Sequence, residues 1–283
     1  MRKITIITGA SSGLGAEFAR QISQKIKKDK EKREIWLIAR NSEKLESVKN
    51  EISGTEKENS ENDEAGKNTG NLEVKTIPMD ISGKTGALSF ELFLEKEKSS
   101  EDFVIENLLN NAGFGTYGPF CETPAEREME MVELNCTALT GICGKAIPFM
   151  KRGSGIINVA SLAAFMPLGN FAVYAATKAY VLSFSIALAA ELKEKGIRVT
   201  ALCPGSVSTD FANVASNGAR KEVLHGKSPA KVVSHCLKRY EKGKQLALWS
   251  FKWRFTAFFS RFFGRYACAR ATYLFNKRPY KKN

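Results

Sequence analysis

Short apolar runs alternate with longer segments that favour helices along most of the chain. The runs are rich in Ile, Val and Leu, which is typical of strands buried on both faces of a sheet. The predicted strands span residues 4–7, 34–39, 72–79, 104–109, 155–159, 197–203 and 244–249, and the predicted helices span residues 16–30, 42–52, 172–195 and 229–242, the last with Ser228 as its N-cap.

This alternation predicts an α/β fold with a single Rossmann-like, doubly wound parallel sheet and helices on both faces. At 283 residues and 43% apolar composition, the chain can bury one large core of this kind. We expect one domain over residues 1–248, with a polar surface insertion at 54–71, and a basic C-terminal helical extension over 249–283.

Hydropathy predicts no membrane-spanning helix, because the chain contains no run of about 18 apolar residues. Met1, Arg2 and Lys3 lead directly into the first strand and leave no room for a signal peptide. We therefore expect a cytoplasmic protein. The six cysteines form no Cys-x-x-Cys pair and only two histidines accompany them, so free thiols are expected rather than disulfides or a metal site.

The extension carries most of the positive charge. The net charge is +13, and nine basic residues lie after Trp249, where no acidic residue occurs. Within 251–266 one stripe is aromatic and another face is basic. The stripe contains Phe251, Phe255, Phe258, Phe259, Phe262 and Tyr266, and the basic face contains Arg254, Arg261 and Arg265.

Three roles remain open for this amphipathic extension. It can pack over a substrate pocket or a partner subunit, with solvated arginines, or it can lie on the surface of an anionic membrane. Nucleic acid is the least favoured partner of the three, and we predict no nucleic-acid binding.

A glycine-rich turn follows the first predicted strand and leads into a helix. Gly9, Gly13 and Gly15 permit unusual backbone dihedral angles and close approach of a ligand. The free N–H groups of the first helical turn face an anion, for which a dinucleotide pyrophosphate is the expected ligand. Ser11, Ser12 and Leu14 complete the predicted loop.

Residues directly after the other strands would meet the same ligand, since a doubly wound sheet binds ligands beyond the carboxyl ends of its strands. Arg40 follows the second strand and offers a cation to a 2′-phosphate, which favours NADP over NAD. Asp80 and Ile81 suit the adenine edge. Asn111, Ala112 and Gly113 follow the fourth strand and would line the cofactor.

Tyr174 and Lys178 lie four residues apart and therefore on one face of a predicted helix, while Ser161 follows the fifth strand. An ammonium beside a phenol favours the phenolate. Lowering the tyrosine pKa by about three units requires roughly 4 kcal/mol. One unit charge at about 4 Å, with an effective dielectric of about 20, supplies a similar energy. We therefore expect Lys178 to lower the pKa of Tyr174.

Five motifs occur in one order, each at the end of a predicted strand or on the following helix. They are Thr-Gly-x-x-x-Gly-x-Gly at 8–15, Asn-Asn-Ala-Gly at 110–113, Ser161, Tyr-x-x-x-Lys at 174–178 and Pro-Gly at 204–205. From about residue 4 to residue 249 the chain resembles the short-chain dehydrogenase/reductase family.

The resemblance implies a role for each catalytic position. Tyr174 would donate a proton to a carbonyl oxygen as hydride arrives from the nicotinamide, or accept one in the reverse direction. Ser161 would hydrogen-bond that oxygen. Tyr174 and Lys178 would also contact the cofactor, Lys178 at the nicotinamide ribose. Asn135 matches the position that holds a water between the lysine and solvent; taken alone, it would be an ordinary helix-interior asparagine.

The resemblance also implies further cofactor contacts. Thr209 matches the residue that steadies the carboxamide, and Pro204, Gly205 and Val207 lie in the same segment. A basic residue after the second strand, with Ser12 in the loop, is typical of NADP-preferring members, so Arg40 would do most of the phosphate recognition. The segments 114–120 and 211–226 would form a partly aromatic pocket for the substrate.

These residues predict an NADP(H)-dependent oxidoreductase acting on a carbonyl or alcohol, with a hydrophobic substrate favoured by the extension. The alternative is a non-catalytic NADP-binding or membrane-tethered protein. The family implies a homodimer or homotetramer, although the extension could block one interface. Contact with the inner face of a membrane is a further possibility for the extension.

Overall fold

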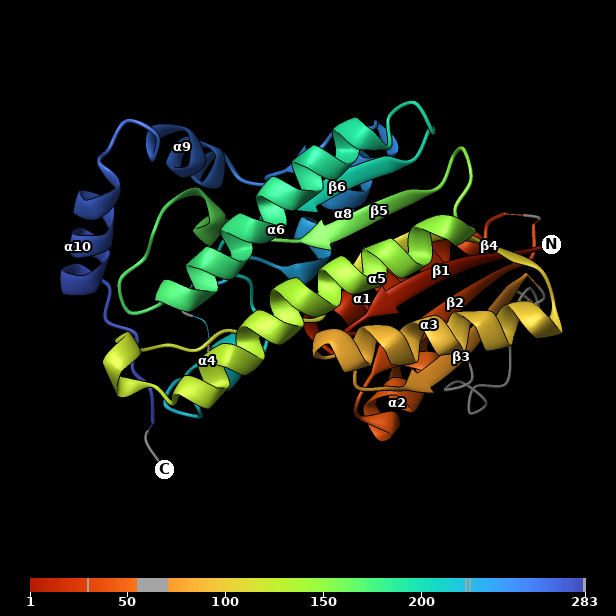
Figure 1. Ribbon diagram of the computed structural model, residues 1–283, viewed down its shortest axis with the longest axis horizontal. Helices are drawn as coiled ribbons and strands as arrows, with labels where there is room; N and C mark the ends of the chain where they lie inside the picture. Colours follow the sequence, from red (N-terminus) through yellow and green to blue (C-terminus); the bar gives the residue numbers. More distant parts are fainter. Residues whose placement is uncertain (30, 55–70, 222, 224, 282–283) are drawn as a thin grey trace, which may run out of the picture.

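A seven-stranded parallel sheet with the strand order β3-β2-β1-β4-β5-β6-β7 forms the centre of the molecule (Figure 1). The computed structural model describes residues 1–29, 31–54, 71–221, 223 and 225–281. The strands are β1 (Arg2–Thr8), β2 (Arg33–Ala39), β3 (Leu72–Pro78), β4 (Phe103–Asn110), β5 (Gly155–Val159), β6 (Arg198–Leu202) and β7 (Leu246–Ala247).

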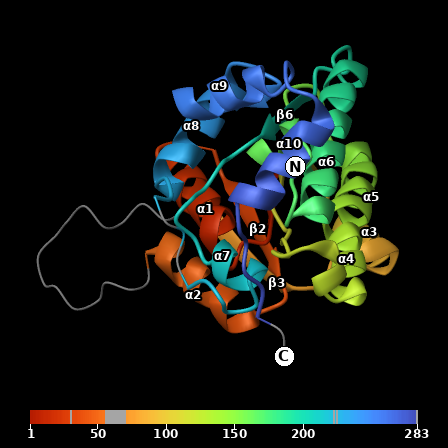
Figure 2. The ribbon, with the colours of Figure 1, turned by 90° about the vertical axis from the view of Figure 1, so that its left-hand side faces the viewer.

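Helices cover both faces of this sheet (Figure 2). One layer contains α1, α2 and α8, and the other contains α3, α5 and α6. A π-helical turn at Glu133–Ala138 connects α4 to α5. The helices are α1 (Gly13–Ile26), α2 (Ser42–Ser53), α3 (Gly83–Ser100), α4 (Ala125–Val132), α5 (Leu139–Ala146), α6 (Ala172–Glu191), α7 (Phe211–Ala215), α8 (Pro229–Glu241), α9 (Phe251–Phe259) and α10 (Arg265–Phe275).

The doubly wound α/β fold is thus confirmed, with differences in individual elements. The last strand is shorter than predicted, and α3, α4, α5 and α7 were not predicted from the sequence. The amphipathic segment at 251–266 is not one helix, because α9 ends at Phe259 and α10 starts after Gly264. Glycine weakens a helix interior, which favours a break there. Residues 55–70 of the predicted insertion lie outside the described residues.

The sheet is apolar on both faces where the sequence is continuously apolar. Ile35, Trp36, Leu37 and Ile38 are all fully buried in β2, although alternate side chains point to opposite faces. This explains why short apolar runs, rather than alternating ones, mark the strands of this chain.

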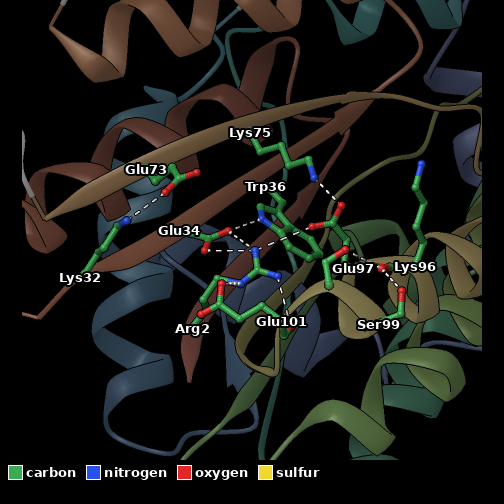
Figure 3. A network of polar contacts seen from close by, with 11 residues as sticks. Arg2, Lys32, Glu34, Trp36, Glu73, Lys75, Lys96, Glu97, Ser99 and Glu101 are labelled. Carbon is green, nitrogen blue, oxygen red and sulfur yellow. Dashed lines mark hydrogen bonds and ion pairs between the residues drawn. The ribbon is translucent and has the colours of Figure 1, made fainter.

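A polar network closes the amino-terminal edge of the sheet (Figure 3). The Arg2 guanidinium forms ion pairs with Glu34 at 3.2 Å, Glu97 at 3.7 Å and Glu101 at 3.2 Å. The indole of Trp36 donates a 2.9 Å hydrogen bond to Glu34, so this buried carboxylate has two partners. The network joins β1 and β2 to α3 at the edge opposite the predicted site.

The expectation that no helix could span a membrane requires correction for α6. This helix, Ala172–Glu191, is long and apolar enough to pass a test of length and composition. Its hydropathy has a structural cause, because Ala175, Val181 and Leu188 are buried, and α6 packs on β5 and β6. The core helix of a folded domain passes the same test.

Candidate active site

The predicted site residues gather at the carboxyl ends of β1, β4, β5 and β6. The arrowheads of the strands point toward the side of the molecule where α10 and the C-terminus lie (Figure 1). β1 pairs with both β2 and β4, so the connections diverge there and open a crevice of the kind that binds ligands in doubly wound sheets.

The glycine turn between β1 and α1 has a shape that only glycine permits. Gly9 and Gly13 have φ values of +63° and +56°, in the left-handed region. A Cβ atom on Gly15 would lie 2.1 Å from the Gly9 carbonyl oxygen. Ser12 is the exposed N-cap of α1 and forms no side-chain cap, while Ser11 and Leu14 are partly buried. The first turn of α1 contains no acidic side chain, so this cradle fits a pyrophosphate.

The loop after β4 is fixed directly against this turn. The Thr8 hydroxyl accepts hydrogen bonds from the backbone N–H groups of Asn111 at 3.0 Å and Ala112 at 3.1 Å. The Asn111 amide donates to the Thr8 and Gly9 carbonyls, each at 3.1 Å. A Cβ on Gly9 would collide with Ala112. Thr8 was part of the quoted motif, but its role as the connector of the two loops was not predicted.

Ser161, Tyr174 and Lys178 lie together beside β5, and each is less than a tenth exposed. Ser161 caps the helical turn at Leu162–Phe165 and shares a side-chain hydrogen bond with Tyr174. Lys178 donates a 2.8 Å hydrogen bond to the Val159 carbonyl, and its Nζ lies 5.7 Å from the centre of the Tyr174 ring. The predicted i, i+4 relationship on α6 is therefore present.

Asn135 lies in the π-helical turn, close to this group. Its side-chain oxygen accepts from the Phe114 N–H at 3.1 Å, and its amide donates to the Phe114 carbonyl at 2.9 Å and to the Thr177 hydroxyl at 3.1 Å. A Cβ on Gly113 would lie 2.7 Å from the Asn135 oxygen and 3.4 Å from the Lys178 nitrogen. The side chain of Asn135 thus fixes the loop that passes over Lys178. The water that the family resemblance implies stays a prediction.

The segment after β6 reaches the glycine turn from the other side. The Thr209 side chain would lie 3.5 Å from a Cβ on Gly13. Val207 is buried, and the Pro204 carbonyl accepts a 2.8 Å hydrogen bond from the N–H of Leu162. Gly205 lies against the Trp253 indole, where a Cβ would be 2.4 Å from Nε1. Trp253 belongs to the C-terminal extension at 249–283, which we call the tail below. Its contact with the segment after β6 was not predicted.

Arg40, Asp80 and Ile81 border the other end of the crevice. Arg40 is exposed, and no ion pair among the described residues includes it. Hydrogen bonds with Ser82 lower the pKa of Asp80 below its ordinary value, and the nearby Arg40 charge contributes in the same direction. The residue directly after β2 is thus a cation rather than a carboxylate, which fits the 2′-phosphate of NADP.

The pKa of Tyr174 differs from the sequence expectation. Burial raises the pKa of this phenol above its ordinary value, and the hydrogen bond with Ser161 only partly opposes the rise. Burial also lowers the pKa of Lys178 to about 8, which weakens its ability to stabilise a phenolate. The expected lowering of the tyrosine pKa is therefore wrong for the chain by itself, because desolvation of the buried phenol is the largest influence on its pKa.

Aromatic rings cover the Tyr174 phenol. The Phe171 ring stacks on it with a centroid distance of 4.1 Å, and the Phe211 ring lies 5.5 Å away. Tyr117 contacts Phe171 edge-on at 4.9 Å. The prediction that 114–120 and 211–226 contribute aromatic walls agrees with these positions. Phe171 was missed, although its place directly before α6 was available as a signal.

The tail packs against the loops of the site. The Thr272 hydroxyl accepts a 2.9 Å hydrogen bond from the Gly169 N–H, and Trp253 and Ala257 of α9 are buried. One side of the tail therefore packs on the protein, as the first of the three roles left open above expects. Its phenylalanines are mostly exposed on the other side: Phe251, Phe255, Phe258, Phe259, Phe262, Phe263 and Phe275.

Comparison with known proteins agrees with the geometry. The family described as short chain dehydrogenase matches residues 3–219. An uncharacterised oxidoreductase of Staphylococcus saprophyticus is 30% identical over 224 residues, covering 78% of this chain and 85% of the relative.

Two solved structures share the fold. A short-chain dehydrogenase from Sphingobium yanoikuyae in complex with NADPH has a TM-score of 0.70 at 24% identity, with 87% of each chain covered. A short-chain dehydrogenase/reductase from Burkholderia phymatum in complex with NAD has a TM-score of 0.73 at 18% identity, covering 99% of this chain and 97% of the other. At these identities the likeness concerns the fold alone.

Lys178→Met should stabilise the fold at pH 7, because burial lowers the pKa of this lysine to about 8 from an ordinary 10.5. Between these values the unfolded chain binds more protons than the folded chain, so stability rises with pH in that window. In the variant the free energy of unfolding should rise less steeply with pH. At pH 7 it should exceed that of the parent chain by about 1–2 kcal/mol, once the lost hydrogen bond to Val159 is subtracted.

Urea unfolding at pH 7 and pH 10 measures this difference. Lys145→Met is the control, because the Lys145 ammonium pairs with Glu91 on the surface at 2.8 Å and should show little change. A Lys178→Met variant that is less stable than the parent chain at pH 7 would contradict the account.

Proposed function

This chain belongs to the short-chain dehydrogenase/reductase family, and on that basis we propose that it is an NADP(H)-dependent oxidoreductase that interconverts a hydrophobic carbonyl compound and its alcohol. The observation that carries the proposal is the grouping of Ser161, Tyr174 and Lys178 beside the glycine turn. The fold and the oxidoreductase family rest on the match over residues 3–219.

In the proposed reaction, the substrate carbonyl oxygen lies between the hydroxyls of Ser161 and Tyr174. Ser161 donates a hydrogen bond that orients the carbonyl, and Tyr174 donates its proton to the oxygen. The nicotinamide, when bound, supplies the hydride for reduction. The raised pKa of Tyr174 keeps the phenol protonated at neutral pH, which suits the reductive direction. The aromatic rings around Tyr174 exclude water, which would compete with the substrate carbonyl for the phenol hydrogen bond.

Lys178 positions the reacting group in this scheme. Its ammonium is fixed by the Val159 carbonyl, and Asn135 fixes the loop above it. In the oxidative direction its charge would favour loss of the Tyr174 proton. Gly113 allows the loop backbone to pass close to both side chains.

One observation supports NADP rather than NAD, and the other predicted contacts would serve either cofactor. Arg40 is an exposed cation directly after β2. NAD-binding folds have an acidic residue at this position, which binds the ribose hydroxyls. The glycine turn supplies the pyrophosphate cradle. Asp80 and Ile81 would border the adenine.

The alternative is a non-catalytic NADP-binding protein with the same fold. The grouping of Ser161, Tyr174 and Lys178 argues against it, because a protein that only binds the cofactor has no need of a hydrogen-bonding serine beside a proton donor. The alternative predicts cofactor binding without turnover.

We further propose a cytoplasmic homodimer or homotetramer. The outer face of α6 exposes Tyr180 and Ile186, and the neighbouring α4 exposes Met129 and Val132. Exposed apolar side chains on adjacent helices are typical of a subunit interface. Such an interface would also account for the apolar composition of α6 on both sides.

The exposed side of the tail supports contact with an anionic membrane. Phe262 and Phe263 are 70% and 62% exposed at the turn between α9 and α10. Arg261 and Arg265 flank them, and the tail contains no carboxylate side chain. Aromatic side chains with adjacent cations favour the interface of a bilayer.

Tyr174→Phe should reduce turnover by about 10²–10⁴-fold, because the variant lacks the proton donor. NADPH binding, measured by the fluorescence of the bound cofactor, should change little, since the ring and its packing remain. The same turnover in Tyr174→Phe as in the parent chain would refute the proposed role.

Arg40→Ala should raise the KM for NADPH by about 10–100-fold through loss of a charge-assisted hydrogen bond, while the KM for NADH stays nearly constant. Lys49→Ala is the matched control, because the Lys49 ammonium already pairs at 3.3 Å with Glu46, three residues earlier in α2. Equal effects on the two cofactors would argue against 2′-phosphate recognition by Arg40.

The double variant Phe262→Ser, Phe263→Ser should float less with vesicles of phosphatidylcholine and phosphatidylserine than the parent chain. Its control is Leu88→Ser, Leu92→Ser, which removes exposed apolar side chains from α3 instead. Flotation should also weaken when phosphatidylserine is omitted. If the parent chain and both variants float to the same extent, the membrane contact is wrong.

A further inference from the structure

The end of the chain packs over the aromatic rings that cover Tyr174. We call residues 276–281 the C-terminal strap. The Asn276 carbonyl accepts a 3.1 Å hydrogen bond from the Asn170 amide. At the other end, the Lys281 N–H donates to the Ser216 carbonyl at 3.0 Å, and the Lys281 carbonyl accepts from the Asn217 amide at 2.9 Å. Figure 2 shows the chain after α10 running past α7.

Both asparagines that hold the strap have left-handed backbones. The φ values are +59° at Asn170 and +51° at Asn217, and His225 is the one other non-glycine residue with a positive φ in the part of the chain that the structure describes. This conformation is uncommon outside glycine and persists where surrounding contacts over-determine it. Asparagine tolerates this conformation better than other non-glycine residues, and here it directs both side-chain amides to the two ends of the strap.

The strap places Arg278 over the rings that cover Tyr174. Its guanidinium carbon lies 5.1 Å from the centre of Phe171 and 6.0 Å from that of Tyr117. Phe171 in turn stacks on Tyr174 with a centroid distance of 4.1 Å. One aromatic ring thus separates the Arg278 cation from the predicted proton donor.

Arg278 has few polar partners for a cation in such a position. It donates a 3.3 Å hydrogen bond to the Gly169 carbonyl. No ion pair between described residues includes Arg278, and the other charge facing Tyr117 is Arg220, at 6.0 Å from its ring. Burial lowers the pKa of Arg278, and Arg220 acts in the same direction. A desolvated guanidinium without a carboxylate binds an incoming anion strongly.

We propose that Arg278 is a specificity-determining residue that binds an anionic group on the substrate, so that the preferred substrate is an apolar carbonyl compound with a carboxylate or a similar anion at one end. The aromatic cluster holds the apolar part, and Ser161 and Tyr174 hold the carbonyl. This inference rests on the proposed function, because it names the substrate class of the same site.

The test compares acids with esters. The probes are linear keto acids with two to eight methylenes between the carbonyl and the carboxylate, and their methyl esters. Binding to the complex with oxidised NADP, which cannot reduce the probes, is measured by calorimetry, and NADPH consumption gives kcat and KM separately. The proteins are the parent chain, Arg278→Gln, Arg278→Lys and the control Arg270→Gln, which alters an arginine of α10 that stacks on Tyr273 instead.

The parent chain should bind at least one acid about 10- to 100-fold more tightly than its ester, as expected for loss of one charge-assisted hydrogen-bond partner. Arg278→Gln should abolish this ratio through weaker acid binding, with ester binding and kcat nearly unchanged. Arg278→Lys should restore part of the ratio, and Arg270→Gln should leave it intact. A variant whose strap is merely distorted would bind acids and esters equally less tightly. The ratio of the two affinities, measured on that one variant, would then stay as in the parent chain.

Equal binding of acids and esters by the parent chain, no binding of either, or an acid preference that survives in Arg278→Gln would overturn the inference. Its failure is distinguishable from failure of the proposed function. Reduction of the esters with NADPH, without charge discrimination, would leave the oxidoreductase proposal intact. Selective binding of acids without any turnover would support the role of Arg278 and count against the reaction.

Discussion

The contact between the ends of β1 and β4 is the constraint on which the site depends. The Thr8 hydroxyl bonds two backbone N–H groups of the loop after β4, and Gly9 permits the close approach. This contact joins the glycine turn to the loop that Asn135 fixes above Lys178. The cofactor cradle and the predicted reacting groups are therefore parts of one rigid unit, supported by parallel pairing of adjacent strands.

Burial has opposite consequences for the fold and for the proposed chemistry. The same desolvation that raises the pKa of Tyr174 lowers that of Lys178. Both groups are less stable in their charged forms here than in water. For Lys178, which is charged at neutral pH, this opposes folding, whereas for Tyr174 it keeps the phenol protonated for the proposed donation. The tail adds a third group of this kind, because the strap places the Arg278 cation against the aromatic rings that cover Tyr174. The proposed function thus relies on charges that the fold leaves incompletely paired.

Much of the fold and the glycine turn could be predicted because strands buried on both faces leave continuous apolar runs, as at 35–38. The site residues could be located because strand ends are adjacent in a parallel sheet. The position of Arg278 could not be predicted, since it arises from packing against Phe171, more than 100 residues earlier in the chain. Phe171 itself lies three residues before Tyr174, so its stacking on that ring was open to prediction and was missed. The pKa of Tyr174 was misjudged because a spacing of four residues reports proximity to Lys178 but not the desolvation of either group.

Transfer of label from the cofactor tests the central claim most directly. The protein is incubated with NADPH that carries deuterium at both positions on C4 of the nicotinamide and with a mixture of apolar aldehydes and ketones, and the products are analysed by mass spectrometry. The account predicts an alcohol that carries one deuterium on the former carbonyl carbon, formed faster with NADPH than with NADH. Binding of NADPH without deuterium in any product would contradict it and favour a non-catalytic cofactor-binding protein.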